Sequence, residues 1–516
     1  MPVISVNQST ALTGFGAPDA YVNIIPPQNI NTVGATTNLG ALVGTGSWGP
    51  LNTVFYFSDP SSLQAAVGNV TIATNDLATE ASQALAFSSN LAGVRVSNGS
   101  DVAAIGVLKD TNPTPATGAT LTAKYTGVVG NTITVTLAQS PFSTSGAPLV
   151  NATVQRQGFA PEFFPNIVST ATGGTFWTNF VNAINNGISG VRGPSQLITA
   201  TIGSSTYPPA FASATLSGGS NGDTAVTDAE LLGTDGTSRT GMYALRGTGA
   251  AVFAICGLTD VTTWPTIEAF AQSEAMLAIV TVPAGTSTTS AITDMQTNNL
   301  NSDWVKLVAE SSLTIFDTLN NVQRQITPLG ETVGVRAAMN PWDSMLNKPI
   351  TGLTNFLQTE RFGAPFSESE ITQMAQAGID AIVNPIVRGP MYGYRTGVVT
   401  SGKTDNYPVF TSFIARSIAL IMGQYVGDLQ GSATGDATRA NARASLQHFF
   451  STIAPYLNGA PTITLSSANN TATTVAQGLM VANISVPYLG VVSYFVANLQ
   501  GGVTVSSASQ TQLSNQ

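Results

Sequence analysis

The sequence predicts an α/β protein, as an α+β multidomain chain in which a discontinuous α/β core carries an inserted β-rich domain and extended N- and C-terminal arms. Three observations lead to this prediction. Continuous apolar runs alternate with helical patterns in two separate parts of the chain, the segment between them is rich in Thr, Gly and β-branched residues, and both ends are polar. A length of 516 residues is enough for about three domains.

The α/β core is predicted to consist of residues 31–111 and 225–390. Apolar runs at 39–44, 250–256 and 276–282 have the length and composition of buried strands, and helical patterns lie near them. Continuous apolar strands that alternate with helices are typical of a parallel sheet covered on both faces. We therefore expect such a sheet in the core.

Residues 112–224 have a different composition, dominated by Thr, Gly and β-branched side chains. Pro113 and Pro115 mark the first border, and the turn-forming residues 217–223 close the segment. Residues 133–137 alternate between apolar and polar side chains, which indicates a half-buried strand. This segment is expected to form a β-rich domain that is inserted into the core.

The C-terminal part is predicted to contain a further domain over residues 391–485, with two long helices at 410–425 and 437–457. Residues 1–30 and 486–516 contain too few apolar side chains to form a core of their own. Chain ends are normally ordered only where they dock on something. We interpret both segments as arms.

The C-terminal arm contains a strand-like apolar run that includes Val491, Val492, Tyr494, Phe495 and Val496. This run is too apolar to remain exposed. A lone strand presents unpaired N–H and C=O groups along its edges, and pairing with a neighbouring molecule satisfies them. We expect the run to form an inter-subunit joint by strand exchange.

Charge is scarce in this chain, because only 9% of its residues are Asp, Glu, Lys or Arg, against about 25% in ordinary soluble proteins. Charged residues are depleted at the centres of protein interfaces, so this composition is typical of a subunit that its neighbours cover. A β-rich secreted or phage-like protein with a neutral surface is the alternative. The net charge is −9 and no Lys/Arg cluster occurs, so no nucleic-acid binding is expected.

The N-terminus has no basic region followed by an apolar run, so we expect no signal peptide and a protein that is made in a cytoplasm and is soluble there. The most apolar helical stretch, at 410–426, contains Arg416 and Gln424. It is shorter than the roughly 20 residues that span a bilayer. No membrane insertion is therefore expected.

The residues that carry most enzyme chemistry are scarce. His448, the single histidine, lies in a helical pattern beside two phenylalanines, and we interpret it as structural. Cys256, the single cysteine, lies in an apolar strand pattern without a nearby base, and it excludes an intrachain disulfide or a zinc site of several thiolates. We expect no catalytic residue, no cofactor and no metal.

One stretch, GVVTSGKT at 397–404, matches the letters of a phosphate-binding loop. Such a loop follows a buried strand and opens a helix whose N-terminus holds the phosphates. The preceding residues lack the pattern of a buried strand, and Pro408 is expected to interrupt the required helix. We interpret the stretch as a glycine turn between two strands that binds no phosphate, with a nucleotide hydrolase using Lys403 and Thr404 as the alternative.

Several motifs, in a shared order along residues 33–500, resemble the tail sheath proteins of contractile phages and related injection machines. LGALVGTGSWGPLNT at 39–53 resembles their apolar strand and Gly-Pro-x-Asn turn, and LTAKYTGVVGNTITVTL at 121–137 is similar to the Gly-x-x-Gly-Asn segment of their inserted domain. AICGLTD at 254–260 and VTVPAG at 280–285 match the α/β core that follows.

The C-terminal motif AGIDAIVNPIVRGPMYGYRTGVVTS at 377–401 contains the family's aromatic residue followed by Gly-x-Arg-Thr. Arg416 matches a central arginine of the helix that follows in the family. The turn that the family has after Val333 and Gly334 is matched only loosely here.

The resemblance implies a homo-oligomeric structural subunit that stacks in rings as a helical sheath around an inner tube. On a baseplate signal the sheath contracts and drives the tube through a target cell envelope, without consuming nucleotide. The implied partners are the tail tube protein and the baseplate and tail terminator proteins. The implied location is the virion, as part of a phage tail assembled in the host bacterial cytoplasm.

In the family, the part that corresponds to residues 391–485 lies innermost. Arg439 and Arg443 are four residues apart and therefore on one face of the expected helix, and they are the candidates for contact with acidic groups of the tube. A solvent-exposed face without a partner is the alternative for these two residues. The alternative for the whole chain is another β-rich virion or surface structural protein.

Overall fold

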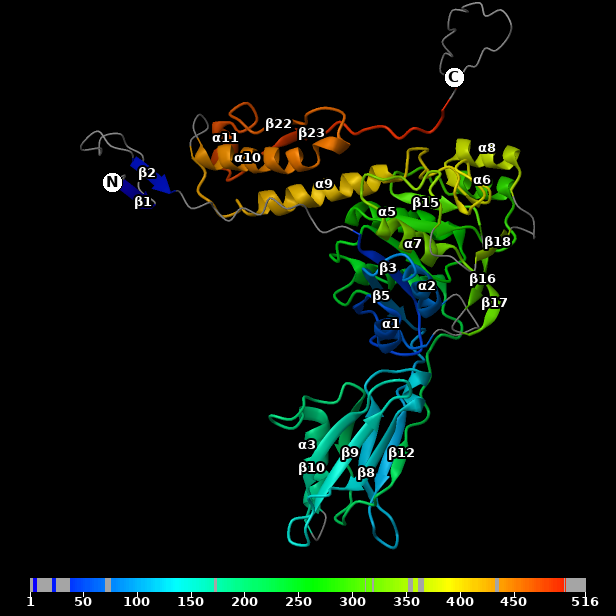
Figure 1. Ribbon diagram of the computed structural model, residues 1–516, viewed down its shortest axis with the longest axis vertical. Coiled ribbons are helices and arrows are strands. Elements are labelled where there is room, and N and C mark those ends of the chain that lie inside the picture. Colours follow the sequence, from blue (N-terminus) through cyan, green and yellow to red (C-terminus); the bar gives the residue numbers. More distant parts are fainter. Residues whose placement is uncertain are drawn as a thin grey trace, which may run out of the picture.

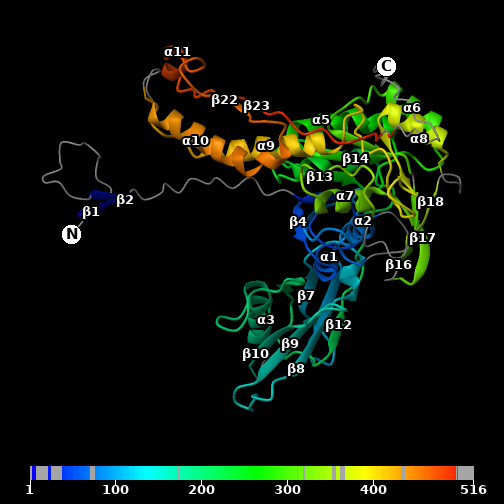
Figure 2. The same cartoon turned by 45° about the horizontal axis from the view of Figure 1, so that its top comes forward.

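The computed structural model describes residues 3–6, 21–24, 38–69, 76–170, 174–310, 312–317, 320–350, 356–360, 366–431, 436–495 and 497. Figures 1 and 2 show three bodies: a central α/β body, a β-rich body that projects from one side of it, and a pair of long helices with a short hairpin on another side. We refer to them as the central body, the β-rich body and the helical body.

A seven-stranded sheet with the order β19-β15-β14-β13-β3-β5-β4 forms the middle of the central body. Neighbouring strands are parallel except for β4 and β5, which are antiparallel. This arrangement confirms the predicted α/β class. The strands are β3 (Gly40–Thr45), β4 (Val54–Phe57), β5 (Leu91–Val96), β13 (Val252–Ile255), β14 (Leu277–Thr281), β15 (Val305–Val308) and β19 (Ile379–Asp380).

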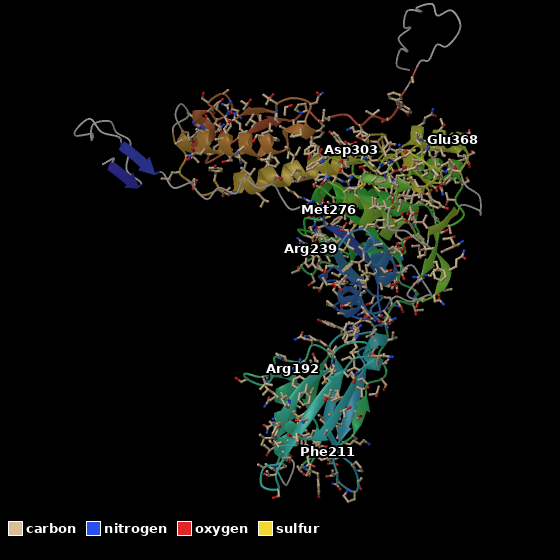
Figure 3. The ribbon with its side chains drawn as sticks, in the orientation of Figure 1. Arg192, Phe211, Arg239, Met276, Asp303 and Glu368 are labelled. Carbon is tan, nitrogen blue, oxygen red and sulfur yellow. The ribbon has the colours of Figure 1, made fainter. Side chains whose placement is uncertain are left out.

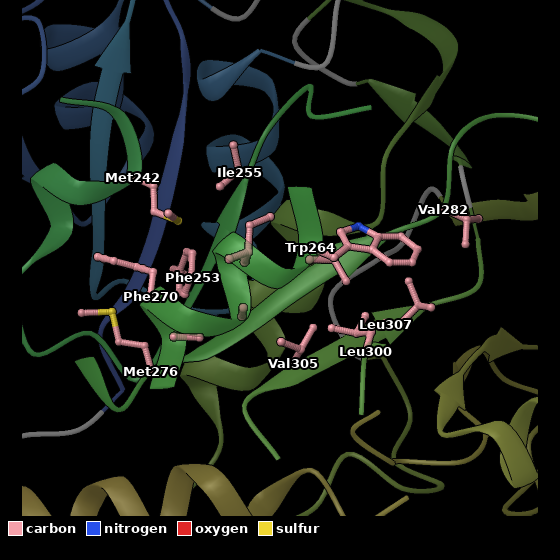
Figure 4. Close-up of a cluster of buried hydrophobic side chains, with 14 of the residues drawn as sticks. Met242, Phe253, Ile255, Trp264, Phe270, Met276, Val282, Leu300, Val305 and Leu307 are labelled. Carbon is pink, nitrogen blue, oxygen red and sulfur yellow. The ribbon is translucent and has the colours of Figure 1, made fainter. Parts of the chain in front are cut away.

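Helices cover both faces of this sheet, as the continuous apolar strands predicted. Successive residues of β3 enter different clusters: Ala41 and Val43 pack on one face, and Leu42 packs on the other. The first face is covered by α5 (Trp264–Glu274), α6 (Thr288–Thr297) and α8 (Glu368–Ala377), and Figure 4 shows its cluster. The second face is covered by α1 (Pro60–Val67), α2 (Leu77–Ala84) and α7 (Leu329–Ala338).

The β-rich body has two sheets and a hydrophobic core of its own, and none of its described strands enters the seven-stranded sheet. One sheet has the order β10-β9-β8-β12, and the other has the order β11-β7-β6. The elements are β6 (Ile105–Lys109), β7 (Thr117–Ala123), β8 (Thr134–Gln139), β9 (Leu149–Gln155), β10 (Glu162–Val168), α3 (Gly174–Asn186), β11 (Ile198–Ile202) and β12 (Ser213–Thr215).

The border that the sequence predicted at residue 112 falls after β6, which belongs to the β-rich sheets and not to the core. The composition of 105–109 is apolar enough to fit either body, and pairing with β7 decides its place. We therefore propose a division that starts the inserted domain before residue 105 and keeps the other predicted borders.

The helical body consists of α9 (Asn406–Gly423), α10 (Ala437–Thr452), α11 (Ala472–Ala476) and a hairpin of β22 (Thr462–Thr464) and β23 (Asn483–Ser485). Phe410, Ile414, Leu446 and Phe449 form its buried cluster. The two long helices predicted in this region are therefore present, with α9 starting four residues earlier than predicted.

The smaller elements complete the described chain. β1 (Val3–Val6) and β2 (Tyr21–Ile24) pair in parallel, although the sequence predicted an irregular arm there. The remaining elements are a sheet of β16 (Ser312–Asp317), β17 (Val322–Ile326) and β18 (Phe356–Glu360), the pair β20 (Ile382–Val383) and β21 (Gly393–Tyr394), and the short helix α4 (Asp228–Leu232).

Helices α2 and α7 approach each other closely, because α7 has glycine at two positions one turn apart. A Cβ added to Gly330 would lie 2.0 Å from the Glu80 carbonyl oxygen, and one added to Gly334 would lie 2.6 Å from the Ala84 carbonyl oxygen. No side chain fits in that space. Gly334 thus lies inside a helix, where it makes the close contact with α2. The resemblance placed a turn in the residues that follow Val333 and Gly334.

This close contact buries two glutamates on facing helices, Glu80 of α2 and Glu331 of α7. Glu80 accepts hydrogen bonds from the Gly330 N–H at 2.8 Å and from the Thr327 hydroxyl. Burial raises the pKa of Glu80 to about 7. Burial and, secondarily, the charge of Glu80 raise the pKa of Glu331 to about 8.

We expect the Glu331→Gln variant to lose less stability at alkaline pH than the wild type. Because the folded-state pKa lies above the unfolded value of about 4.5, the contribution of Glu331 is fully present below pH 4.5 and is lost as the pH rises through 8. Between pH 6 and 9 the wild type should lose about 2–3 kcal/mol more than the variant in urea unfolding. The exposed Glu368→Gln variant serves as control, and equal pH profiles for all three proteins would contradict the assignment.

Candidate functional site

The joint between the central body and the β-rich body is built around Arg95, which is fully buried at the end of β5. Its guanidinium donates to the carbonyl oxygens of Gly46 at 2.9 Å, Gly49 at 2.8 Å, Thr126 at 2.8 Å and Asn221 at 3.1 Å. Gly46 and Gly49 belong to the central body, and Thr126 and Asn221 lie in the inserted segment. One side chain therefore holds both parts.

A second arginine contributes to this joint from the other side. Arg156, just after β9, donates to the Gln64 carbonyl oxygen at 2.6 Å and the Ala65 carbonyl oxygen at 3.2 Å, both in α1. Its guanidinium lies 5.5 Å from the ring centroid of Trp48 and 4.3 Å from that of Phe159. Burial lowers the pKa of both Arg95 and Arg156 to about 10, which still leaves them charged at neutral pH.

The joint between the central body and the helical body has the same chemistry. Arg416, in the middle of α9, donates to the carbonyl oxygens of Gly249, Ala250, Glu274 and Ala275. These four carbonyls lie just before β13 and at the C-terminal end of α5, where helix carbonyls lack intrahelical partners. The resemblance had matched Arg416 to a central arginine of the family, and its role here is to hold α9 on the core.

The N-terminal end of α9 is held by a buried ion cluster. The Lys306 ammonium on β15 contacts the Asp380 carboxylate on β19 and lies 3.0 Å from the Asp405 carboxylate, which directly precedes α9. All three side chains are fully buried. Burial alone would raise the pKa of Asp380, but Lys306 and hydrogen bonds from Thr396 hold it below its usual value. Asp405 also accepts from Ser344 Oγ at 2.7 Å.

The stretch 397–404 forms a tight turn, as predicted, but the turn is closed by an isolated bridge and followed by a helix, not set between two strands. Val398 and Thr404 form an antiparallel bridge, and the Gly402 N–H donates to the Val399 carbonyl oxygen at 2.8 Å. Gly402 has a φ of 78°, which glycine adopts readily. The Lys403 ammonium lies 2.6 Å from Asp303 and is half exposed.

The helical context of this stretch differs from the expectation. A helix, α9, does follow it, and Pro408 lies in the first turn, where its missing N–H leaves no hydrogen bond unmade. The prediction that Pro408 interrupts the helix is therefore wrong. The Asp405 carboxylate nevertheless stands beside the N-terminus of α9, where it opposes the approach of a second anion such as phosphate.

Arg439 and Arg443 do not share an exposed face. Arg439 is buried, and its guanidinium lies 3.6 Å from the Asp436 carboxylate at the start of α10. Arg443 is exposed on the same helix. Of these two arginines, Arg443 is therefore the one that a partner could contact at the surface of the subunit.

The apolar run at the C-terminus forms no strand in the described residues 491–495 and 497. Val492, Tyr494 and Phe495 are 76%, 86% and 89% exposed, and Val491 is half-buried. Val496 lies outside the described residues. The segment before this run packs along α9: the Tyr488 hydroxyl lies 3.2 Å from the Thr411 hydroxyl on that helix.

The single cysteine and the single histidine have surroundings that are ordinary for structural residues. Cys256 is buried, and burial raises the pKa of its thiol well above the usual value, so it remains protonated at neutral pH. His448 is exposed on α10. Across the ranges that the structure describes, no three His, Cys, Asp or Glu side chains gather as a metal site, and no helix there has the length and apolarity of a membrane span.

The fold is similar to the folds of two sheath tail proteins of known structure. The sheath tail protein of Listeria innocua superposes with a TM-score of 0.60 and 13% identity over 88% of this chain and 96% of that protein. The sheath tail protein of Desulfitobacterium hafniense superposes with a TM-score of 0.54 and 13% identity over 86% of this chain and 93% of that protein. The chain thus has the fold of these two sheath tail proteins. No protein-family model and no curated protein matches the sequence.

Arg95, Arg156 and Lys306 are the structurally decisive residues that the sequence analysis missed. A signal was present for two of them, because Arg95 and Lys306 are single charges inside otherwise apolar strands. Lys, Arg, Asp and Glu are almost never fully buried unless they are paired. A charge within a buried strand therefore indicates a specific internal partner.

We expect Arg416→Met to loosen α9 from the core while the apolar stem keeps its packing. Removal of a charged donor shared by four carbonyls should lower the free energy of unfolding by about 2–4 kcal/mol and accelerate amide exchange in α9. The exposed Arg443→Met variant should change stability by less than about 0.5 kcal/mol. Equal amide exchange in α9 of the two variants would contradict this role.

Proposed function

We propose that the chain is the structural subunit of a contractile tail sheath, of a phage or a related injection machine. It polymerises in stacked rings around an inner tube and contracts to drive the tube through a cell envelope. The subunit acts mechanically and is not an enzyme. Its partners are other copies, the tube protein, and the baseplate and terminator proteins, in a virion tail that is assembled in the host cytoplasm.

One observation carries this proposal: the fold is shared with two sheath tail proteins over nearly the whole length of all three chains. The composition supports it, since a chain with 9% charged residues is typical of a subunit that neighbours cover. The joints between the three bodies support it too. Arg95 and Arg416 hold separate bodies together through buried contacts, which can transmit force without a chemical reaction.

Within this function, the C-terminal run joins neighbouring subunits by strand exchange. Val492, Tyr494 and Phe495 are almost fully exposed in the isolated subunit, and large apolar side chains in such a row are typical of an interaction site. Strand addition would satisfy their backbone groups and cover their side chains together. The N-terminal arm, residues 1–30, takes part in the same exchange.

We expect the triple variant Val492→Ser, Tyr494→Ser, Phe495→Ser to fold normally and to form no cylinders. The substituted side chains are exposed in the subunit, so the melting temperature should remain unchanged, and negative-stain microscopy should show single particles. Deletion of residues 1–25 should have the same effect. Tyr56→Ser, on an exposed position of β4 in the central body, is the control. Normal cylinders of the triple variant would refute the joint, and a wild type that forms none would refute the sheath function.

The tube contact is proposed for Arg443 on α10, since Arg439 is buried. We expect Arg443→Glu to reduce co-assembly with the tube, because the exposed guanidinium is replaced by a charge that acidic groups repel. Pelleting of tube and sheath together measures this, and Lys124→Glu on the β-rich body is the matched charge reversal. An equal yield of filled sheaths for Arg443→Glu, Lys124→Glu and the wild type would remove Arg443 from the contact.

A further inference from the structure

The β-rich body is almost free of charge. From residue 105, where β6 begins, to residue 222 the charged residues are Lys109, Asp110, Lys124, Arg156, Glu162 and Arg192. Arg156 is held by carbonyls of α1, Arg192 lies 3.3 Å from Glu162, and Lys124 donates to Gln196 at 2.8 Å. Asp110 is buried and accepts a hydrogen bond from the Ser205 hydroxyl at 2.5 Å, so Lys109 is the exposed charge that remains.

Large apolar side chains are exposed at the end of this body that lies farthest from the central body. We name Phe142, Val168, Tyr207 and Phe211 the distal patch; they are 73%, 52%, 48% and 56% exposed. Figure 3 shows Phe211 at this end, and Arg192 nearer to the central body. A neutral body that exposes such side chains is poorly suited to permanent contact with water.

Hydrogen bonds connect the segments that carry the distal patch. Ser140, two residues before Phe142, donates to Asn166 Oδ1 at 2.6 Å, two residues before Val168. The Leu137 N–H at the end of β8 donates to the Ala212 carbonyl oxygen at 3.1 Å, next to Phe211. The patch thus lies on several segments held together at one end of the body.

Strand addition does not explain this surface. β10 is an edge strand, but Pro165 stands in its middle, and its pairing with β9 shifts register between Phe164 and Ile167. Proline and irregularities of this kind protect an edge from pairing with another strand. At the β10 edge, the exposed side chains and not the backbone are therefore available for contact.

The charge pattern identifies the occupant. An uncharged apolar surface fits another surface of the same kind, and every copy of this chain supplies one. Two chains of net charge −9 repel each other, and a contact through bodies that are nearly free of charge minimises that cost. Lys109 is the exposed charge at the nearby end of β6. In a contact between two copies, the two Lys109 side chains would lie at the rim.

We propose that the distal patch binds the β-rich body of a second copy of this chain. This inference rests on the proposed function, in which many copies assemble side by side. It assigns to the inserted domain a lateral contact that is separate from the exchanged arms. The contact is made by aromatic and aliphatic side chains.

The double variant Phe142→Ser, Phe211→Ser tests this contact in the full chain. Loss of two exposed rings should raise the concentration at which cylinders form by at least about tenfold, measured by sedimentation velocity and negative stain. Tyr56→Ser, an equally exposed aromatic residue on β4 of the central body, is the control and should leave assembly unchanged.

A cross-link in the otherwise unchanged chain provides a second test. Cys256 is buried, so Ser145→Cys in the β8–β9 connection adds the reactive thiol at the distal end. A short bismaleimide should join two copies through residue 145, whereas Ser100→Cys near the central body should give no dimer. Unchanged assembly of the double variant, or no dimer through residue 145, overturns the proposal. Dimers through residue 145 without cylinders would support this contact and refute the sheath function.

Discussion

A single buried ammonium group, that of Lys306, connects the parts of the central body on which the other bodies depend. It binds Asp380 on the edge strand β19 and Asp405 at the start of α9, so the last strand of the sheet and the first turn of the helical body share one cation. Removal of the Lys306 ammonium would leave two carboxylates buried without compensation, and such a loss typically costs about 3–5 kcal/mol. The cluster therefore fixes where the helical body begins.

Beyond this cluster, the bodies are held together by arginines that bind carbonyl oxygens and not carboxylates. Arg95 and Arg156 do this at the β-rich body, and Arg416 does it at the helical body. Each guanidinium offers five donors in a fixed plane, so one side chain satisfies several carbonyls that strand and helix ends leave free. In a chain with so few acidic residues, backbone dipoles supply the negative partners.

Much of the fold followed from the sequence, because its signals are local. The alternation of Ala41, Leu42 and Val43 between two faces needs only a strand with helices on both sides, and the apolar runs predicted that. The place of β6 did not follow, because strand pairing between 105–109 and 117–123 is a tertiary choice. The same holds for the site: their apolar run predicted that a neighbouring subunit covers Tyr494 and Phe495, and both are exposed in the isolated subunit. Burial of Arg439 did not follow, because it depends on the contact of its own helix start with Asp436.

The joints also determine how the subunit responds to its surroundings. Mobile ions screen charges that face the solvent within about 10 Å at 0.1 M salt, but they have little access to buried groups. Arg95 and Lys306 are fully buried and bind their partners directly. The relative placement of the three bodies within the subunit is therefore insensitive to salt, in dilute fresh water as in concentrated brine.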